Sequence, residues 1–328
     1  MNLPFAQVEP TTRCNFTCGF CAGRHMPQRD ITPETFQAFI DQAEGLEHIE
    51  LQGEGEPLLH PQFFGLIEIA RRKFPQLQFS LITNGSLFTA ENIDGLLRHR
   101  VTRIFVSMES ADDAAFQRIR GGKLERVRRG IRELLAERDA RGMDAPVVGL
   151  AVTVLKSAVP GIGRGIADFY GDLGLDGGIT LQRLQAMPQY SRLYPAAVRG
   201  ELPDEADMRR LDDELRGNAA FLAALRQRQD RPGFYELLYA SVDTSVRCPW
   251  LENALYVATG GELVPCCHAK DYARDRLGDL GSGVEAALRK RAGLALQLRQ
   301  GKIPPSCTGC AIAHRIAFGA LVGRKPLA

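Results

Sequence analysis

Three cysteines near the N-terminus have the spacing of iron–sulfur ligands. They are Cys14, Cys18 and Cys21, in the pattern C-x3-C-x2-C. A [4Fe–4S] cluster is usually held by four thiolates, so a compact motif with three leaves one iron open to a substrate or a cofactor. A structural zinc site or a disulfide cluster is the alternative, but zinc sites favour paired C-x2-C motifs that supply four ligands. The spacing therefore favours a cluster that takes part in chemistry.

The last third of the chain contains a second set of cysteines. Their order is C-x17-C followed later by C-x2-C, with one extra cysteine: Cys248, Cys266, Cys267, Cys307 and Cys310. A hairpin predicted over residues 254–264 and a helical stretch before the last pair can bring four of these thiols together. Four cysteines could also hold a structural zinc ion, and both interpretations remain open at this point.

Composition and charge exclude several other classes of protein. The 328 residues carry a net charge of +2, which gives no electrostatic reason to expect nucleic acid or a membrane as partner. The segment Arg118–Arg141 is locally basic, but glutamates interleave with its arginines. We therefore predict a solvated helix face there, in preference to a phosphate-binding patch.

The chain lacks the sequence signals of export and of membrane insertion. Residues 1–5 have neither a basic region nor a long apolar stretch, so we expect no signal peptide. No apolar run reaches the ~18 residues of a transmembrane helix. Eight cysteines without an export signal favour reduced thiols and metal ligation over disulfides. We predict a cytoplasmic protein.

The first half of the sequence alternates predicted strands with amphipathic helices. Six strands are predicted, over Phe5–Glu9, His48–Gln52, Gln78–Ile82, Arg103–Ser107, Val147–Leu155 and Gly178–Leu184. Repeated β-α units imply parallel strands with right-handed crossovers, and six units are too few for a full eight-fold barrel. We therefore predict an α/β fold with a partial, TIM-like (β/α)6 barrel. From Pro188 to about Arg231 the pattern breaks, and a charged helix over Asp204–Arg228 is expected to form a connector.

The cysteine motif with its aromatic residue, C-x3-C-x-Phe20-C, directly follows a predicted strand and resembles the signature of the radical S-adenosylmethionine (SAM) superfamily. The resemblance implies a (β/α)6 core with the cluster at the carboxyl ends of the strands. It also implies that the open iron chelates the amino and carboxylate groups of SAM. In that superfamily an electron from the cluster cleaves SAM to methionine and a 5′-deoxyadenosyl radical, which abstracts a hydrogen atom from the substrate.

Further loops at predicted strand ends resemble the SAM-binding segments of the same superfamily. Gly53-Glu54-Gly55-Glu56-Pro57 is similar to its GGEP motif, which contacts the SAM amino group, although Glu54 replaces the first glycine of the stricter form. Which carboxylate contacts the ligand is therefore open. The Asn84-Gly85 turn is equally well explained by ordinary turn chemistry. The SAM-binding residues that the resemblance implies are Phe20, Gly53, Gly55, Glu56, Pro57, Asn84, Ser107 and Glu109.

The C-terminal cysteines resemble the twitch domain, a shortened SPASM module, and the G-x4-C element from Gly261 to Cys266 matches it as well. This resemblance implies one auxiliary [4Fe–4S] cluster, fully ligated by Cys248, Cys266, Cys307 and Cys310, in a small hairpin-plus-helix domain. The expected organisation is a radical SAM core over 1–186, a helical connector over 187–245 and the auxiliary domain over 246–328. Cys267 is left over, as a packed spectator or as a hydrogen-atom donor that faces the substrate.

Two reactions and one other class of protein follow from this pattern. The favoured reaction is net oxidation of an aminocyclitol-like, sugar-like or peptide substrate, in which the auxiliary cluster accepts an electron. The alternative is epimerisation, in which Cys267 returns a hydrogen atom. A small-molecule or peptide substrate and a flavodoxin- or ferredoxin-type reductant are the expected partners. An iron–sulfur electron-transfer protein that never cleaves SAM is the alternative of another class.

Overall fold

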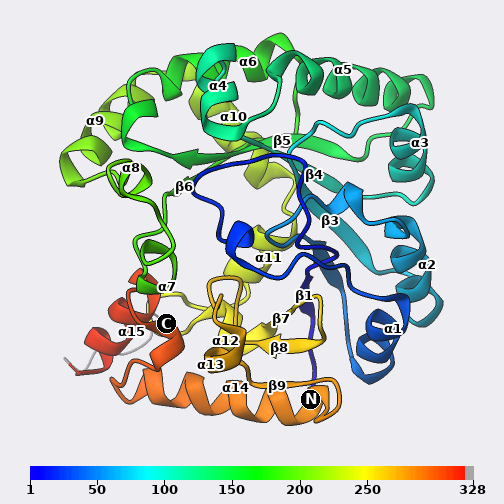
Figure 1. Ribbon diagram of the computed structural model, residues 1–328, viewed down its shortest axis with the longest axis vertical. Coiled ribbons are helices and arrows are strands. Elements are labelled where there is room, and N and C mark those ends of the chain that lie inside the picture. Colours follow the sequence, from blue (N-terminus) through cyan, green and yellow to red (C-terminus); the bar gives the residue numbers. More distant parts are fainter. Residues whose placement is uncertain (322–328) are drawn as a thin grey trace.

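Six parallel strands form the core of the computed structural model, which describes residues 1–321. The strands are β1 (Phe5–Val8), β2 (His48–Leu51), β3 (Gln78–Thr83), β4 (Arg103–Met108), β5 (Val147–Val154) and β6 (Ile179–Arg183). Each strand pairs in parallel with the next one along the chain. The predicted α/β fold with a partial barrel of parallel strands is confirmed (Figure 1).

Helices connect the strands and lie along the outer side of the sheet (Figure 1). They are α1 (Pro33–Gln42), α2 (Phe63–Lys73), α3 (Ala90–Arg98), α4 (Asp113–Arg120), α5 (Leu124–Ala140) and α6 (Ala167–Asp172). Side-chain caps start several of these helices. The Thr32 side chain accepts a hydrogen bond from the Thr35 amide, and Pro33 occupies the first turn of α1. Thr89 and Asp112 cap α3 and α4 in the same way.

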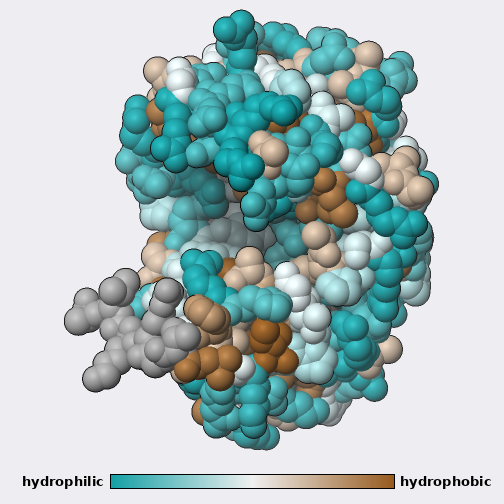
Figure 2. Space-filling view, turned by 90° about the vertical axis from the view of Figure 1, so that its left-hand side faces the viewer, coloured by the Kyte–Doolittle hydropathy of each residue, from teal (hydrophilic) through white to brown (hydrophobic). Residues whose placement is uncertain are grey.

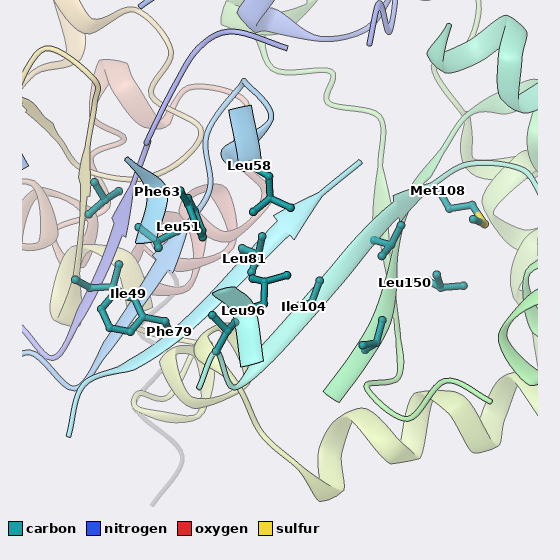
Figure 3. Packing of buried hydrophobic residues seen from close by; sticks show 14 of the residues in the cluster. Ile49, Leu51, Leu58, Phe63, Phe79, Leu81, Leu96, Ile104, Met108 and Leu150 are labelled. Atoms are coloured by element: carbon teal, nitrogen blue, oxygen red, sulfur yellow. The ribbon is translucent and has the colours of Figure 1, made fainter. Parts of the chain in front are cut away.

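Alternation along each strand separates an apolar outer face from a polar inner face. Ile49, Leu51 and Leu81 project with Phe79 and Ile104 into the layer between the sheet and the helices (Figure 3). The residues between them in sequence point the other way, because successive side chains of a strand alternate in direction. Polar residues such as Gln7, Glu50 and Ser80 are therefore buried inside the barrel.

The connector is built from several helices, so the prediction of one charged helix over Asp204–Arg228 was wrong. After α7 (Pro188–Ser191) and α8 (Ala196–Arg199) come α9 (Glu205–Arg216), α10 (Ala219–Asp230) and α11 (Phe234–Ala240). The long helix breaks at Gly217-Asn218, where the Asn218 side chain accepts from the Phe221 amide and caps a new helix.

The C-terminal hairpin extends the same sheet. It is formed by β7 (Ala254–Val257) and β8 (Glu262–Val264), which are antiparallel as predicted. β7 pairs in parallel with β1, and β9 (Gly278–Asp279) follows β8, so nine strands form one sheet in the order β6-β5-β4-β3-β2-β1-β7-β8-β9. The division into three domains stays a prediction.

Four helices complete the described chain. They are α12 (Pro249–Asn253), α13 (Tyr272–Asp275), α14 (Val284–Arg299) and α15 (Ala311–Leu321). Arg291 ties α14 to the end of the sheet by donating to the carbonyls of Ala254, at 2.6 Å, and Glu252, at 2.8 Å. Within residues 1–321, no helix is long and apolar enough to span a membrane.

Candidate active site

A cavity of about 730 Å³ lies at the carboxyl ends of the barrel strands. Its walls come from the loops after β1 and β2, from β4, β5 and β6, and from the segment after β8. The face on the left in Figure 1 is visibly hollowed near mid-height in the space-filling view (Figure 2). The cavity therefore brings residues from both ends of the chain to one place.

The cysteines Cys14, Cys18 and Cys21, here called the N-terminal triad, all line this cavity. The loop that carries them is held by Arg120, whose carbonyl accepts from the Thr17 amide at 2.9 Å and lies 3.9 Å from Cys18 Sγ. Burial raises the pKa of each thiol, that of Cys21 most strongly. Three unpaired thiols that line a common wall fit the donor chemistry of an iron–sulfur cluster with an open iron.

Arg120 also lines this cavity, so its assignment to a solvated helix face was wrong. Its side chain is 8% exposed and binds both carboxylate oxygens of Glu109, one of them at 2.7 Å. Its guanidinium also lies 3.9 Å from Cys18 Sγ. Most of the arginines and glutamates that alternate in this segment do lie on the exposed face of α5. Arg120 is different, because it is the last residue of α4 and is buried.

Glu109, an expected SAM contact, lies behind this arginine. Both of its oxygens are occupied by Arg120, and it lines a second cavity, of about 480 Å³, instead of the large one. Ser107, at the end of the same strand β4, does line the large cavity.

The loop after β2 approaches β1 so closely that two of its positions accommodate only glycine. A Cβ on Gly53 would overlap the Glu9 side chain, and a Cβ on Gly55 would overlap the carbonyls of Thr11 and Arg13. Both glycines line the cavity. The GxG pattern therefore reflects a close backbone approach that shapes the cavity wall.

Glu56 holds the neighbouring turn in place. Its carboxylate accepts from Thr83 Oγ1 at 2.7 Å, the Asn84 amide at 2.7 Å and the Leu58 amide at 3.2 Å. Burial raises the pKa of Glu56, and the three hydrogen bonds oppose that rise. Pro57 starts the 3₁₀ turn Pro57–Leu59 and is buried outside the residues that line the cavity.

Two other expected SAM contacts also line the cavity. The Asn84 side-chain amide donates to Asn15 Oδ1 at 2.9 Å and lies 3.8 Å from Cys14 Sγ, so it links the β3 turn to the cysteine loop. Phe20, partly buried, lines the cavity between Cys18 and Cys21.

Lys270 is a second residue that the sequence analysis missed. Its ammonium lies 2.7 Å from Glu54 Oε1, and its side chain is 4% exposed. It follows Cys266-Cys267-His268 in a short segment without periodicity, so no pattern in the sequence marked it. Cys267, His268 and Lys270 all line the large cavity.

The other four C-terminal cysteines, Cys248, Cys266, Cys307 and Cys310, here called the C-terminal quartet, lie close to one another. Burial is the main reason why the pKa of Cys266 is raised well above its usual value. The neighbouring thiol groups of Cys267, Cys307 and Cys248 raise it further. Burial and then the charge of Cys248 raise the pKa of Cys307 to about 12. Cys248, Cys307 and Cys310 also pack in one apolar cluster. Among residues 1–321, no group of three or more His, Cys, Asp and Glu side chains could hold a single metal ion.

Comparisons with known proteins agree with this architecture. Residues 8–152 match the model of the Radical SAM superfamily. It is 27% identical over 275 residues to the tungsten-containing aldehyde ferredoxin oxidoreductase cofactor-modifying protein of Pyrococcus furiosus, covering 80% of this chain and 71% of the relative. It is 29% identical over 301 residues to the PqqA peptide cyclase of Streptomyces rochei, covering 86% of this chain and 72% of the relative.

Two solved structures share the fold. SuiB of Streptococcus suis bound to S-adenosylmethionine superposes with a TM-score of 0.67 at 14% identity, covering 96% of this chain and 72% of SuiB. The enzyme anSMEcpe with bound AdoMet and the Cp18Cys peptide has a TM-score of 0.67 at 18% identity, covering 96% of this chain and 88% of that one. At these identities the likeness concerns the fold alone.

Proposed function

We propose that this protein is a radical SAM oxidoreductase that acts on a peptide. The observation that carries the proposal is a single cavity that is lined both by the N-terminal triad and by Cys267 and His268. When bound there, a [4Fe–4S] cluster and SAM would supply a 5′-deoxyadenosyl radical that abstracts a hydrogen atom from an unactivated C–H bond. The protein residues position the two groups and enclose the substrate.

Under this proposal the N-terminal triad holds the cluster, and the neighbouring loops form the SAM pocket. The close approach of Gly53 and Gly55 leaves backbone amides and carbonyls at the wall. Glu56 orients the Asn84 turn, while Phe20 and Ser107 line the remaining wall. Glu109 acts through Arg120, whose cation lies beside Cys18.

The C-terminal quartet would hold an auxiliary [4Fe–4S] cluster that takes the substrate electron. Burial, and the mutual influence of these thiols on their pKa values, support a common ligand set. Oxidation also releases a proton. His268 lines the cavity, and its buried Nδ1 has no hydrogen-bond partner among residues 1–321, so its ring is the group we assign to relay that proton.

A peptide is favoured over an aminocyclitol or a sugar as substrate. The PqqA peptide cyclase acts, by its name, on a peptide, and anSMEcpe and SuiB have been solved with bound peptides. The cavity wall is compatible with a peptide, since it contains glutamines whose amides can donate to and accept from a peptide backbone: Gln7, Gln52, Gln182 and Gln185. The electron that the chemistry requires would come from a flavodoxin- or ferredoxin-type reductant.

Epimerisation is the second candidate, and one observation favours it. Cys267 lines the cavity, and burial raises the pKa of its thiol to about 12. The sulfur therefore keeps its proton at neutral pH, which a hydrogen-atom donor requires.

Iron and sulfide analysis after anaerobic reconstitution tests the proposal. We expect about eight irons per chain in the wild type and about four in a Cys14/Cys18/Cys21→Ala variant. Only the wild type should then convert SAM to 5′-deoxyadenosine under reducing conditions. A wild type that binds iron without cleaving SAM would instead be an electron-transfer protein, and zinc retained by the C-terminal quartet would remove the electron-acceptor role.

A further inference from the structure

A buried ion pair joins the C-terminal part of the protein to the loop beside the N-terminal triad. Lys270 Nζ lies 2.7 Å from Glu54 Oε1, and the two side chains are only 4% and 13% exposed. Lys270 lies between Cys267 and α13, whereas Glu54 lies in the loop after β2. Exposed ion pairs contribute little, but a buried pair is energetically important because each charge is costly without the other.

The other side of Glu54 contacts the triad itself. Its Oε2 accepts from the Gly23 amide at 3.1 Å and lies 3.6 Å from Cys21 Sγ. The Glu54 carbonyl lies 3.4 Å from the same sulfur. A Cβ on Gly23 would come within 2.5 Å of Glu54 Cβ, so the two segments touch. Glu54 thus fixes the position of Cys21 through backbone and side-chain contacts.

This contact brings two negative groups together in a poorly hydrated place once Cys21 is a thiolate. Like charges at such a distance repel strongly where water is excluded. Glu9 adds a third acidic group, because its Oε1 accepts from the Glu54 amide at 2.8 Å. Lys270 brings a positive charge to this cluster of acids: it contacts Glu54 directly, and its charge lowers the pKa of both Glu54 and Glu9 against the effect of burial.

The surroundings of Lys270 hold its ammonium in one position. It lies 4.9 Å from the centre of the Tyr256 ring, a cation–π contact, and Tyr190 and Tyr272 lie near it. Burial lowers the pKa of Lys270, but the opposing effects, of which the charge of Glu54 is the largest, outweigh it, and the pKa is raised well above its ordinary value. The cation is therefore permanent at physiological pH.

We propose that Lys270 is a positioning residue of the triad: its ammonium compensates Glu54, so that the carboxylate can hold Cys21 without making the nearby cluster harder to reduce. The C-terminal part of the chain would then serve the SAM-cleaving site directly, besides holding its own cysteines. This inference rests on the proposed function, since it requires a cluster on the triad. It adds a residue that the cysteine and glycine motifs do not include.

The test removes each charge separately and then both together. The reconstituted full-length protein is compared as wild type, Lys270→Met, Glu54→Gln and the double variant Glu54→Gln/Lys270→Met. Lys270→Arg keeps the charge, and Lys290→Met makes the same change at an exposed lysine of α14. The measurements are iron per chain, the Kd for SAM and the midpoint potential of the triad cluster, followed by electron paramagnetic resonance. The Cys14/Cys18/Cys21→Ala variant identifies which signal belongs to the triad.

We expect Lys270→Met to make the triad potential more negative and Glu54→Gln to make it more positive. The double variant should return toward the wild-type potential, and Lys270→Arg and Lys290→Met should leave it unchanged. If Lys270→Met loses the triad iron, the double variant must recover it, because removing the carboxylate removes the repulsion. An unchanged potential and Kd in a fully loaded Lys270→Met protein would overturn the inference, as would iron loss that the double variant does not repair. Failure of the proposed function would be separate, because the triple cysteine variant would then lose no iron.

Discussion

The two groups of cysteines differ in what surrounds them. The N-terminal triad lies on a loop at the wall of the large cavity, and Arg120 and the Glu54–Lys270 pair bring charges close to its sulfurs. Three members of the C-terminal quartet, Cys248, Cys307 and Cys310, pack among apolar residues of α12, α14 and α15, such as Leu251, Leu298 and Ile316. The neighbouring charges that most affect its pKa values are those of other thiols and of Glu252 and Asp275.

Under the proposed function, this difference would correspond to different tasks for two cluster sites of similar ligand chemistry. An open wall with compensating cations suits a cluster that must bind a cofactor and accept an electron easily. A closed, apolar site suits a cluster that stores an electron away from solvent, because hydrogen bonding and exposure tune the potential of such clusters.

Single cysteine variants should give the largest effect. Cys18→Ala should abolish formation of 5′-deoxyadenosine, because the triad has no spare ligand. Cys310→Ala should keep substrate-free SAM cleavage and lose the oxidised product. Chromatographic measurement of both products, with iron content alongside, distinguishes the two sites. Equal loss of SAM cleavage in both variants would show that the sites do not work separately.

We expect the buried Arg120–Glu109 pair to be needed for iron binding at the triad and not at the quartet. Arg120→Met leaves the Glu109 carboxylate buried without its partner and should cost about 3–5 kcal/mol of unfolding free energy. Arg129→Met, at a position whose side chain is 68% exposed, is the matched control. Urea unfolding of the metal-free proteins gives the difference. In the reconstituted protein we expect loss of triad iron with the quartet iron retained; the reverse pattern would contradict the assignment.

The next largest effect is expected from changes in the apolar packing around the quartet. Leu298 on α14 is 1% exposed and packs in the same apolar cluster as Cys307. Leu298→Ala should cost about 2–5 kcal/mol through the cavity it leaves. Leu296→Ala, on the same helix but 50% exposed, should cost far less. The Leu298→Ala protein should lose quartet iron more readily on dilution while SAM cleavage continues, and parallel losses at both sites would argue against independent packing.

The sequence predicted the N-terminal barrel better than the C-terminal part of the chain. Six strands were located to within one or two residues, because apolar alternation and β-α repetition are local signals. Gly53 and Gly55 lie where the loop after β2 packs closely and they line the cavity, but their contact with SAM stays a prediction. The parallel pairing of β7 with β1 could not be foreseen, since it depends on contacts between the two ends of the chain.

Arg120 and Lys270 escaped sequence reasoning for a similar reason. Arg120 lies in a basic run whose other members are mostly exposed, and only the contact with Glu109 and the cysteine loop buries it. Lys270 is singled out only by its ion pair with Glu54, which is far away in the sequence. Sequence patterns identify ligands by spacing, whereas the groups that compensate the ligands' charge are found only when the chain is folded.

Cys267 provides the smallest expected effect. Its thiol pKa of about 12 lies above the working range, so the sulfur stays protonated from about pH 6 to 9 and a donor role would not vary with pH there. If oxidation is the reaction, Cys267→Ala should form full product at an unchanged rate, because the thiol only lines the cavity. Reaction in deuterated water, with mass spectrometry of the product, checks this, and Cys267→Ser is the control for side-chain volume. Incorporation of one solvent deuteron by the wild type, lost in both variants, would show that Cys267 returns a hydrogen atom and that the protein is an epimerase.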